Sequence, residues 1–192
     1  MISRHLYKIK RTSNYDFLNR STFLRLDRNE RNFPFPKKVI KDLKKFITNY
    51  SLQAYPADKQ TLVSKIGRFE KINSDYIEIV PGSDAALKYI FEIFAFKKSS
   101  LSSIYPTYGM IDVYSKVYKA YLYKIKRKPN KFNHNDYFKK NIKWIYIANP
   151  NQPDGEIISL NNIIKIIKKA KKKNITVVID EAYINFSKQS SL

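Results

Sequence analysis

Residues 143–155 read KWIYIANPNQPDG, and residues 175–183 read ITVVIDEAY. Each stretch begins with β-branched and aromatic residues and ends in polar ones, as a strand followed by a loop does. Between them, apolar residues recur at near-helical spacing from Leu160 to Ile167, and Ser159 stands where a helix cap is expected. This succession is typical of a parallel sheet covered by helices.

The same alternation extends towards the N-terminus. We predict strands at residues 76–80, 101–105, 121–125, 143–148 and 175–179. Helices are expected at residues 37–49, 62–69, 83–96 and 110–118. We therefore predict an α/β fold in which one mostly parallel sheet lies between two layers of helices, a three-layer αβα arrangement.

The chain is strongly basic, with 37 Lys and Arg against 16 Asp and Glu and a formal net charge of +21. Such a charge is compatible with a nucleic-acid or anionic-membrane partner. However, only eight of the 37 are Arg, the residue preferred for bidentate phosphate and base contacts. The lysines gather on expected helix faces, which favours general lysine richness over nucleic-acid binding.

Several classes of protein are disfavoured by composition. There is no cysteine, and His5 and His134 are too far apart in sequence for a zinc-ligand motif. The most apolar stretch, residues 85–96, carries two charged residues and is too short to cross a bilayer. The N-terminus has no uninterrupted apolar segment of the signal-peptide kind. We therefore expect a soluble, cytoplasmic protein.

Polar and aromatic residues follow four of the predicted strands. Because ligands bind outside the carboxyl ends of such strands, these residues are candidates for a site. Ser83 and Asp84 open a helix, whose first N–H groups suit a phosphate. Tyr108 offers a flat ring for stacking, and Asp180 ends a buried strand, where a carboxylate is costly without a cation. The turn at 149–155 adds fixed amide donors.

Each of these features also has an ordinary structural explanation, as a helix cap, a core aromatic or a plain turn. Taken together, they meet the needs of one ligand, pyridoxal phosphate, which has a phosphate, a flat ring, a ring hydroxyl and a pyridine nitrogen that works when protonated.

Six motifs also occur in the order seen in a known family. They are LDRNE (26–30), YP (55–56), GSD (82–84), PTY (106–108), NPNQPDG (149–155) and DEAY (180–183). From Leu26 to Phe186 the chain resembles the histidinol-phosphate aminotransferases and their relatives, which are class I/II, fold-type-I enzymes dependent on pyridoxal phosphate. The resemblance implies amino transfer between an amino donor, such as histidinol phosphate, and a 2-oxo acid.

The resemblance also implies roles for individual residues. Ser83 and Asp84 would bind the cofactor phosphate, Tyr108 would stack on its ring, and Asp180 would pair with the ring nitrogen. Tyr183 and Gln152 would reach the ring hydroxyl oxygen. Tyr55 would reach the phosphate in a neighbouring subunit, which implies a homodimer, and Asn29 and Glu30 would line the substrate pocket. Two positions depart from the usual pattern, since Gln152 replaces an Asn and Ala85 replaces a Glu.

In the family, the lysine that holds the cofactor comes after the DEAY motif, which here would place it beyond Leu192. We therefore expect residues 1–36 to form an N-terminal arm and substrate-side loop, and residues 37–192 part of the cofactor-binding large domain, without the small domain. Such a chain would be inactive alone. Two alternatives stay open, a basic nucleic-acid-binding protein and a non-catalytic domain that binds pyridoxal phosphate.

Overall fold

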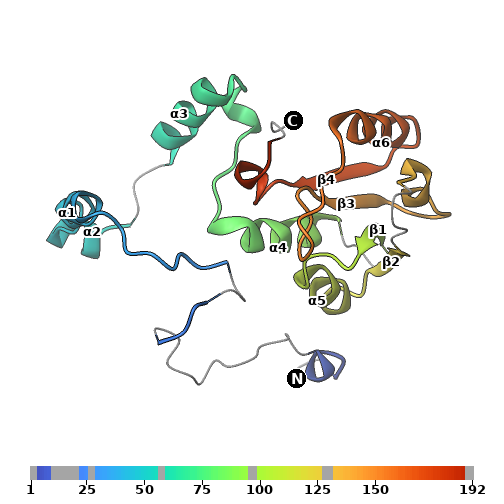
Figure 1. The fold of residues 1–192 in the computed structure, drawn as a ribbon, viewed down its shortest axis with the longest axis horizontal. Helices are drawn as coiled ribbons and strands as arrows, with labels where there is room; N and C mark the ends of the chain where they lie inside the picture. Colours follow the sequence, from blue (N-terminus) through green and yellow to red (C-terminus); the bar gives the residue numbers. More distant parts are fainter. Residues whose placement is uncertain are drawn as a thin grey trace. The chain divides into compact units, whose positions relative to one another are not determined.

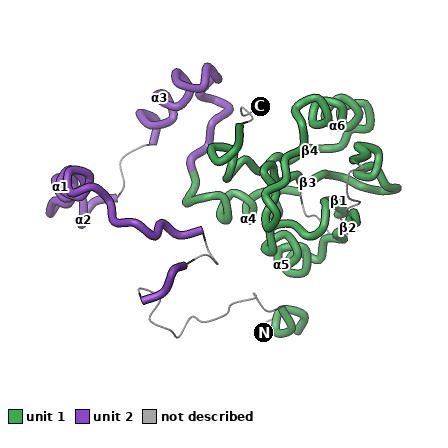
Figure 2. The backbone as a smooth tube through the Cα atoms, viewed as in Figure 1, with its two compact units in different colours: residues 1–12, 80–192 green, residues 13–79 purple. Residues whose placement is uncertain are grey.

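A computed structural model describes residues 4–9, 22–25, 29–55, 59–94, 99–126 and 132–188 of the chain. By its internal contacts the chain divides into two compact units, residues 1–12 with 80–192, and residues 13–79 (Figure 2). The predicted division at residue 36 stays a prediction. No helix in the described ranges is long and apolar enough to span a membrane.

The larger unit contains a four-stranded parallel sheet (Figure 1). Its strands are β1 (Ser100–Tyr105), β2 (Tyr121–Lys126), β3 (Trp144–Ala148) and β4 (Thr176–Asp180), in the order β2-β1-β3-β4. Four predicted strands are thus confirmed to within one residue at each end. Turn-forming or charged residues lie close to both ends of each strand in the sequence, which explains why the sequence locates the strands well.

Helices cover both faces of this sheet, as predicted (Figure 1). On one face, α4 (Gly82–Phe94) and α5 (Met110–Val117) pack against Leu101, Trp144 and Tyr146. On the other, α6 (Leu160–Lys172) and a 3₁₀ turn, η4 (His134–Tyr137), pack against Ile145 and Ile147. Successive β3 residues point to opposite faces, so the strand is buried on both sides and the arrangement has three layers.

The predicted strand at 76–80 is wrong. A 3₁₀ turn, η3 (Ser74–Tyr76), begins the segment, and residues 77–80 form no regular element. The backbone at Ile77 is extended (φ −115°, ψ 124°), but it pairs with no strand among the described residues. Ile77 packs instead beside Gly67, where a Cβ would lie 3.5 Å from its Cδ1 atom. An extended segment becomes a strand only when another strand supplies hydrogen-bond partners.

The smaller unit carries three helices, α1 (Lys37–Lys45), α2 (Asn49–Gln53) and α3 (Gln60–Glu70). The helix expected at 62–69 is confirmed, whereas the one expected at 37–49 ends at Lys45. Thr48 then starts α2 through a capping box with Ser51, since each accepts a hydrogen bond from the other's backbone N–H. Of the expected N-terminal arm, the structure describes residues 4–9, 22–25 and 29–36, which include a short 3₁₀ turn, η1 (Leu6–Lys8).

Candidate functional site

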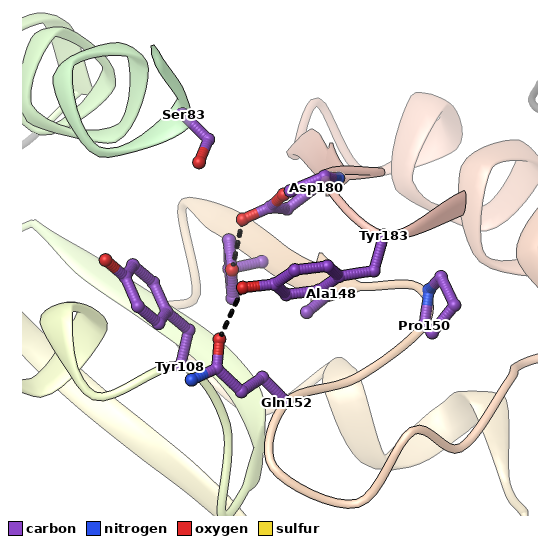
Figure 3. Close-up of a pocket in the computed structure, with 9 residues that line it drawn as sticks. Ser83, Tyr108, Ala148, Pro150, Gln152, Asp180 and Tyr183 are labelled. Atoms are coloured by element: carbon purple, nitrogen blue, oxygen red, sulfur yellow. Dashed lines mark hydrogen bonds between the residues drawn. The ribbon is translucent and has the colours of Figure 1, made fainter. Parts of the chain in front are cut away.

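A small open cavity of about 50 Å³ lies at the carboxyl ends of β3 and β4 (Figure 3). Its lining comes from the larger unit: Ser83, Tyr108, Tyr146, Ala148, Pro150, Gln152, Asp180, Ala182 and Tyr183. The structure therefore brings together five residues that the sequence placed after strands, namely Ser83, Tyr108, Gln152, Asp180 and Tyr183. Tyr146 is the lining residue with site chemistry that the sequence prediction missed.

Strand register places a tyrosine and an aspartate on the same face of the sheet. Ala148 of β3 lies opposite Asp180 of β4, and Tyr146 precedes Ala148 by two residues. Because side chains alternate along a strand, all three point towards the α4 side. The Tyr146 hydroxyl donates to Oδ2 of Asp180 at 2.7 Å, and the Ala182 backbone N–H donates to Oδ1 at 3.1 Å. Each carboxylate oxygen thus has a donor.

The tyrosine of this pair is fully buried, with 0% of its surface exposed. Burial raises the pKa of Tyr146 far above its usual value, and the nearby charge of Asp180 raises it further. The phenol therefore keeps its proton and acts as the donor. Among the described residues, no Lys, Arg or His forms an ion pair with Asp180. This half-buried carboxylate therefore has hydrogen-bond donors but no positive partner in the part of the chain that the structure describes.

The turn after β3 is held by its two asparagines. Asn149 is fully buried, and its side chain bonds the backbone of Ile158 twice, accepting from the N–H at 2.8 Å and donating to the C=O at 3.3 Å. Asn151 donates to the Pro106 carbonyl at 3.1 Å and accepts from the Thr107 hydroxyl at 2.9 Å. Both amides are thus used inside the protein, and Gln152 is the amide that lines the cavity.

Gln152 and Tyr183 meet on one side of the cavity, where the Tyr183 hydroxyl donates to the Gln152 Oε1 atom at 3.3 Å (Figure 3). Tyr108 comes from the turn between β1 and α5, and its hydroxyl lies 3.4 Å from Asp84 Oδ1. Asp84 itself does not line the cavity. Of the two residues expected to bind the phosphate at the start of α4, Ser83 therefore lines the cavity and Asp84 lies beside Tyr108.

The chain enters α4 through a glycine with a left-handed backbone. Gly82 has φ +81°, a conformation that other residues adopt only with strain. Ser83 follows in the first turn of α4, and its exposed hydroxyl points towards the cavity (Figure 3). The N–H groups of this turn lack partners within the helix, so an anion here would meet the positive end of the helix dipole.

Three predicted site residues belong to the smaller unit. Tyr55 is 98% exposed, and Glu30 accepts a charged hydrogen bond from Arg25 at 2.8 Å. Asn29 has a left-handed backbone (φ 54°). The cavity is lined without these three residues, so their roles stay predictions. The motif residues Leu26, Asp27, Arg28 and Pro56 lie outside the described residues.

The sequence matches the aminotransferase class I and II family over residues 21–192. It is 33% identical to a dihydroxyacetone phosphate transaminase of Campylobacter jejuni, over 90% of this chain and 48% of that protein. It is 30% identical to a histidinol-phosphate aminotransferase of Thermoanaerobacter, over 93% and 52% respectively. The chain therefore spans about half the length of these curated relatives.

Solved structures share the same fold. The histidinol-phosphate aminotransferase of Sinorhizobium meliloti, in complex with pyridoxal-5'-phosphate, superimposes with a TM-score of 0.69 at 17% identity, over 79% of this chain and 42% of that one. The corresponding enzyme of Clostridium acetobutylicum gives 0.66 at 24% identity, over 80% and 45%. Since the family match covers most of the sequence, the chain belongs to the aminotransferase class I and II family.

Proposed function

We propose that this chain forms the cofactor pocket of an aminotransferase dependent on pyridoxal phosphate. The observation that carries the proposal is Asp180, a half-buried carboxylate that faces the cavity with two hydrogen-bond donors and no cation from the described protein. A protonated ring nitrogen is the positive partner that such a carboxylate would accept. When bound, the cofactor supplies an electron sink for the carbon that exchanges its amino group.

The other lining residues fit the remaining parts of that ligand. Ser83 and the first N–H groups of α4 would hold the phosphate, because an anion is stabilised at a helix N-terminus. Tyr183 and Gln152 would reach the ring hydroxyl oxygen from their shared side of the cavity. Tyr108 would supply the stacking ring. Asp84 would act through its contact with Tyr108, since it does not line the cavity.

The substrates of the whole protein are part of the proposal. Both curated relatives are named for transamination of a phosphorylated compound, dihydroxyacetone phosphate or histidinol phosphate. We expect a small phosphorylated amino donor or acceptor here, with a 2-oxo acid as the counterpart. Asn29 and Glu30 would line the substrate side, and Tyr55 would serve the partner subunit of a cytoplasmic homodimer. The cofactor lysine is expected beyond Leu192, so the 192-residue chain would bind cofactor without transaminating.

Titration of the 192-residue chain with pyridoxal phosphate tests the proposal. Fluorescence quenching should reveal one saturable site. Asp180→Asn keeps the shape but removes the charge, and should weaken binding by at least about 10-fold, the scale of a charged hydrogen bond. Asp136→Asn is the matched control, because Asp136 lies in η4 on the opposite face of the sheet and should leave affinity unchanged. Lack of saturable binding, or equal affinities for the two variants, would refute the proposed cofactor site.

A further inference from the structure

Tyr146 stands out because it lines the cavity from inside a strand rather than from a loop after one. It is the middle residue of β3, fully buried, and its hydroxyl is 2.7 Å from the Asp180 carboxylate. An O–H···O⁻ bond of this length belongs to the strong, charge-assisted class. The tyrosine therefore contributes a rigidly placed donor to the group that faces the ligand.

The surrounding backbone fixes both partners of this bond. Tyr146 pairs in register with Val178, two residues before Asp180, so the ring reaches diagonally along the sheet to the carboxylate. The Asn149 N–H donates to the Asp180 carbonyl at 2.9 Å, which holds the end of β4 against the turn after β3. With Ala182 N–H on Oδ1 and Tyr146 on Oδ2, the carboxylate is held at both oxygens.

If Tyr146 had only a structural role, its buried hydroxyl would need a hydrogen-bond partner of any kind. Two features of its partner indicate a role at the ligand site as well. The partner is a charged group at the cavity, and among the described residues no basic side chain neutralises it. Burial, reinforced by the charge of Asp180, raises the pKa of Tyr146, so the proton stays on the phenol and Asp180 stays the acceptor.

We propose that Tyr146 is a positioning residue that orients the Asp180 carboxylate towards the ring nitrogen of the bound cofactor. The inference rests on the proposed function and adds a residue that does not itself need to touch the ligand. Tyr146→Phe keeps the aromatic ring between the sheet and α4 but removes the hydroxyl that donates to Oδ2 of Asp180. The affinity for pyridoxal phosphate should then fall by about 10-fold, as expected when a hydrogen bond to a charged group is lost.

An analogue of the cofactor separates orientation from packing. In this probe, CH replaces the ring nitrogen of pyridoxal phosphate, while the phosphate, hydroxyl and aldehyde stay. If Tyr146 acts through Asp180 on the nitrogen, Tyr146→Phe should weaken binding of pyridoxal phosphate and leave binding of the analogue unchanged. A general loss of packing would weaken both ligands equally.

The hydrogen bond itself has a readout without any cofactor. A buried phenol proton held by a carboxylate should give a slowly exchanging, downfield proton NMR signal in the free 192-residue chain. The signal should vanish in both Tyr146→Phe and Asp180→Asn. Tyr118→Phe is the matched control, because its hydroxyl bonds another carboxylate, Glu92, at 2.9 Å, away from the cavity. This control should leave the signal and both affinities unchanged.

The outcomes separate this inference from the function on which it rests. If the unsubstituted chain shows no saturable binding of pyridoxal phosphate, the proposed function fails and the inference fails with it. If the chain binds but Tyr146→Phe weakens both ligands equally, or neither, the function stands and the positioning role is refuted. Selective loss for pyridoxal phosphate, with loss of the proton signal, supports the role.

Discussion

The hydroxyl of Tyr183 donates to the side-chain oxygen of Gln152, 31 residues earlier in the chain, across 3.3 Å. Tyr183 follows β4 and Gln152 lies in the turn after β3, so the bond joins two loops at the edge of the cavity (Figure 3). The two residues therefore form one hydrogen-bonding unit.

A double-mutant cycle tests that unit. Gln152→Ala and Tyr183→Phe should each weaken binding of pyridoxal phosphate, and the double variant should lose less than the sum. Coupling of about 1 kcal/mol is expected for two groups that share a hydrogen bond. Titration of the four proteins measures it. Additive losses would show that the two side chains contact the ligand independently.

The turn after β3 should depend on Asn149 for stability. Asn149→Ala removes both hydrogen bonds to Ile158 and leaves the backbone N–H and C=O of that buried residue without their partner. A loss of about 2–3 kcal/mol in the free energy of unfolding is expected, because unsatisfied buried groups are costly. Urea unfolding measures it. Asn161→Ala, at an exposed position of α6, should change stability little. Equal effects of the two substitutions would argue against the bracing role of Asn149.

Substitution of Gly67 by alanine should destabilise the protein, although alanine usually stabilises a helix relative to glycine. Replacing a helical glycine normally stabilises a protein by about 1 kcal/mol. Here a Cβ would lie 2.8 Å from the Ile72 carbonyl oxygen and 3.0 Å from Ser74 Oγ. Gly67→Ala should therefore lower the stability of the fold, measured as thermal unfolding followed by circular dichroism. Gly109→Ala is the control, since nothing lies within 4 Å of its Cβ position. If Gly67→Ala is as stable as the parent, the close approach is not present in solution.

Asp112 should give the protein a small acid-sensitive contribution to stability. Burial alone would raise the pKa of Asp112, but Lys116 and Lys124, at 2.5 and 2.6 Å, outweigh it and lower the pKa below its usual value. A carboxyl with a lower pKa in the folded state stabilises the protein above its unfolded pKa of 3.8. This stabilisation is lost as the pH falls through the folded pKa.

The Asp112→Asn variant should therefore differ from the parent at neutral pH and converge with it in acid. Unfolding curves between pH 7 and pH 2 measure the difference. High salt should reduce this difference, because both lysine partners are exposed and the ion pairs are screened. A gap between the two proteins that persists at pH 2 would contradict this electrostatic account.

The sequence predicts this fold well where local signals suffice. The β3 run from Trp144 to Ala148 is bounded by Pro150, and the β4 run ends at Asp180, so both strands are found from composition and turn residues. Ile77 shows the limit. Its neighbourhood is apolar and extended, yet whether it joins a sheet depends on a pairing partner that no local pattern specifies.

The cavity residues likewise divide into those that local sequence signals predict and those that depend on strand pairing. The sequence predicts Asp180, Tyr183 and Gln152 as site candidates because ligands bind beside the residues that follow strands, and all three line the cavity. Tyr146 was missed because it lies inside a strand, and its meeting with Asp180 depends on the register of β3 against β4. Alternation along β3 places the Tyr146 and Ala148 side chains on the same face of the sheet. Only the pairing of Ala148 with Asp180 shows that the Asp180 carboxylate lies on that face too.

Pyridoxal phosphate is expected to bind at the carboxyl ends of β3 and β4, and a backbone-amide NMR titration of the 192-residue chain tests this most directly. Saturable shifts should gather at residues 82–84, 108, 152 and 180–183, and Asp180→Asn should weaken them. The competing site is the lysine-rich face of α6, Lys165 to Lys172, which would attract any anion with a phosphate or react with its aldehyde. Shifts confined to α6, and unchanged by Asp180→Asn, would contradict this expectation.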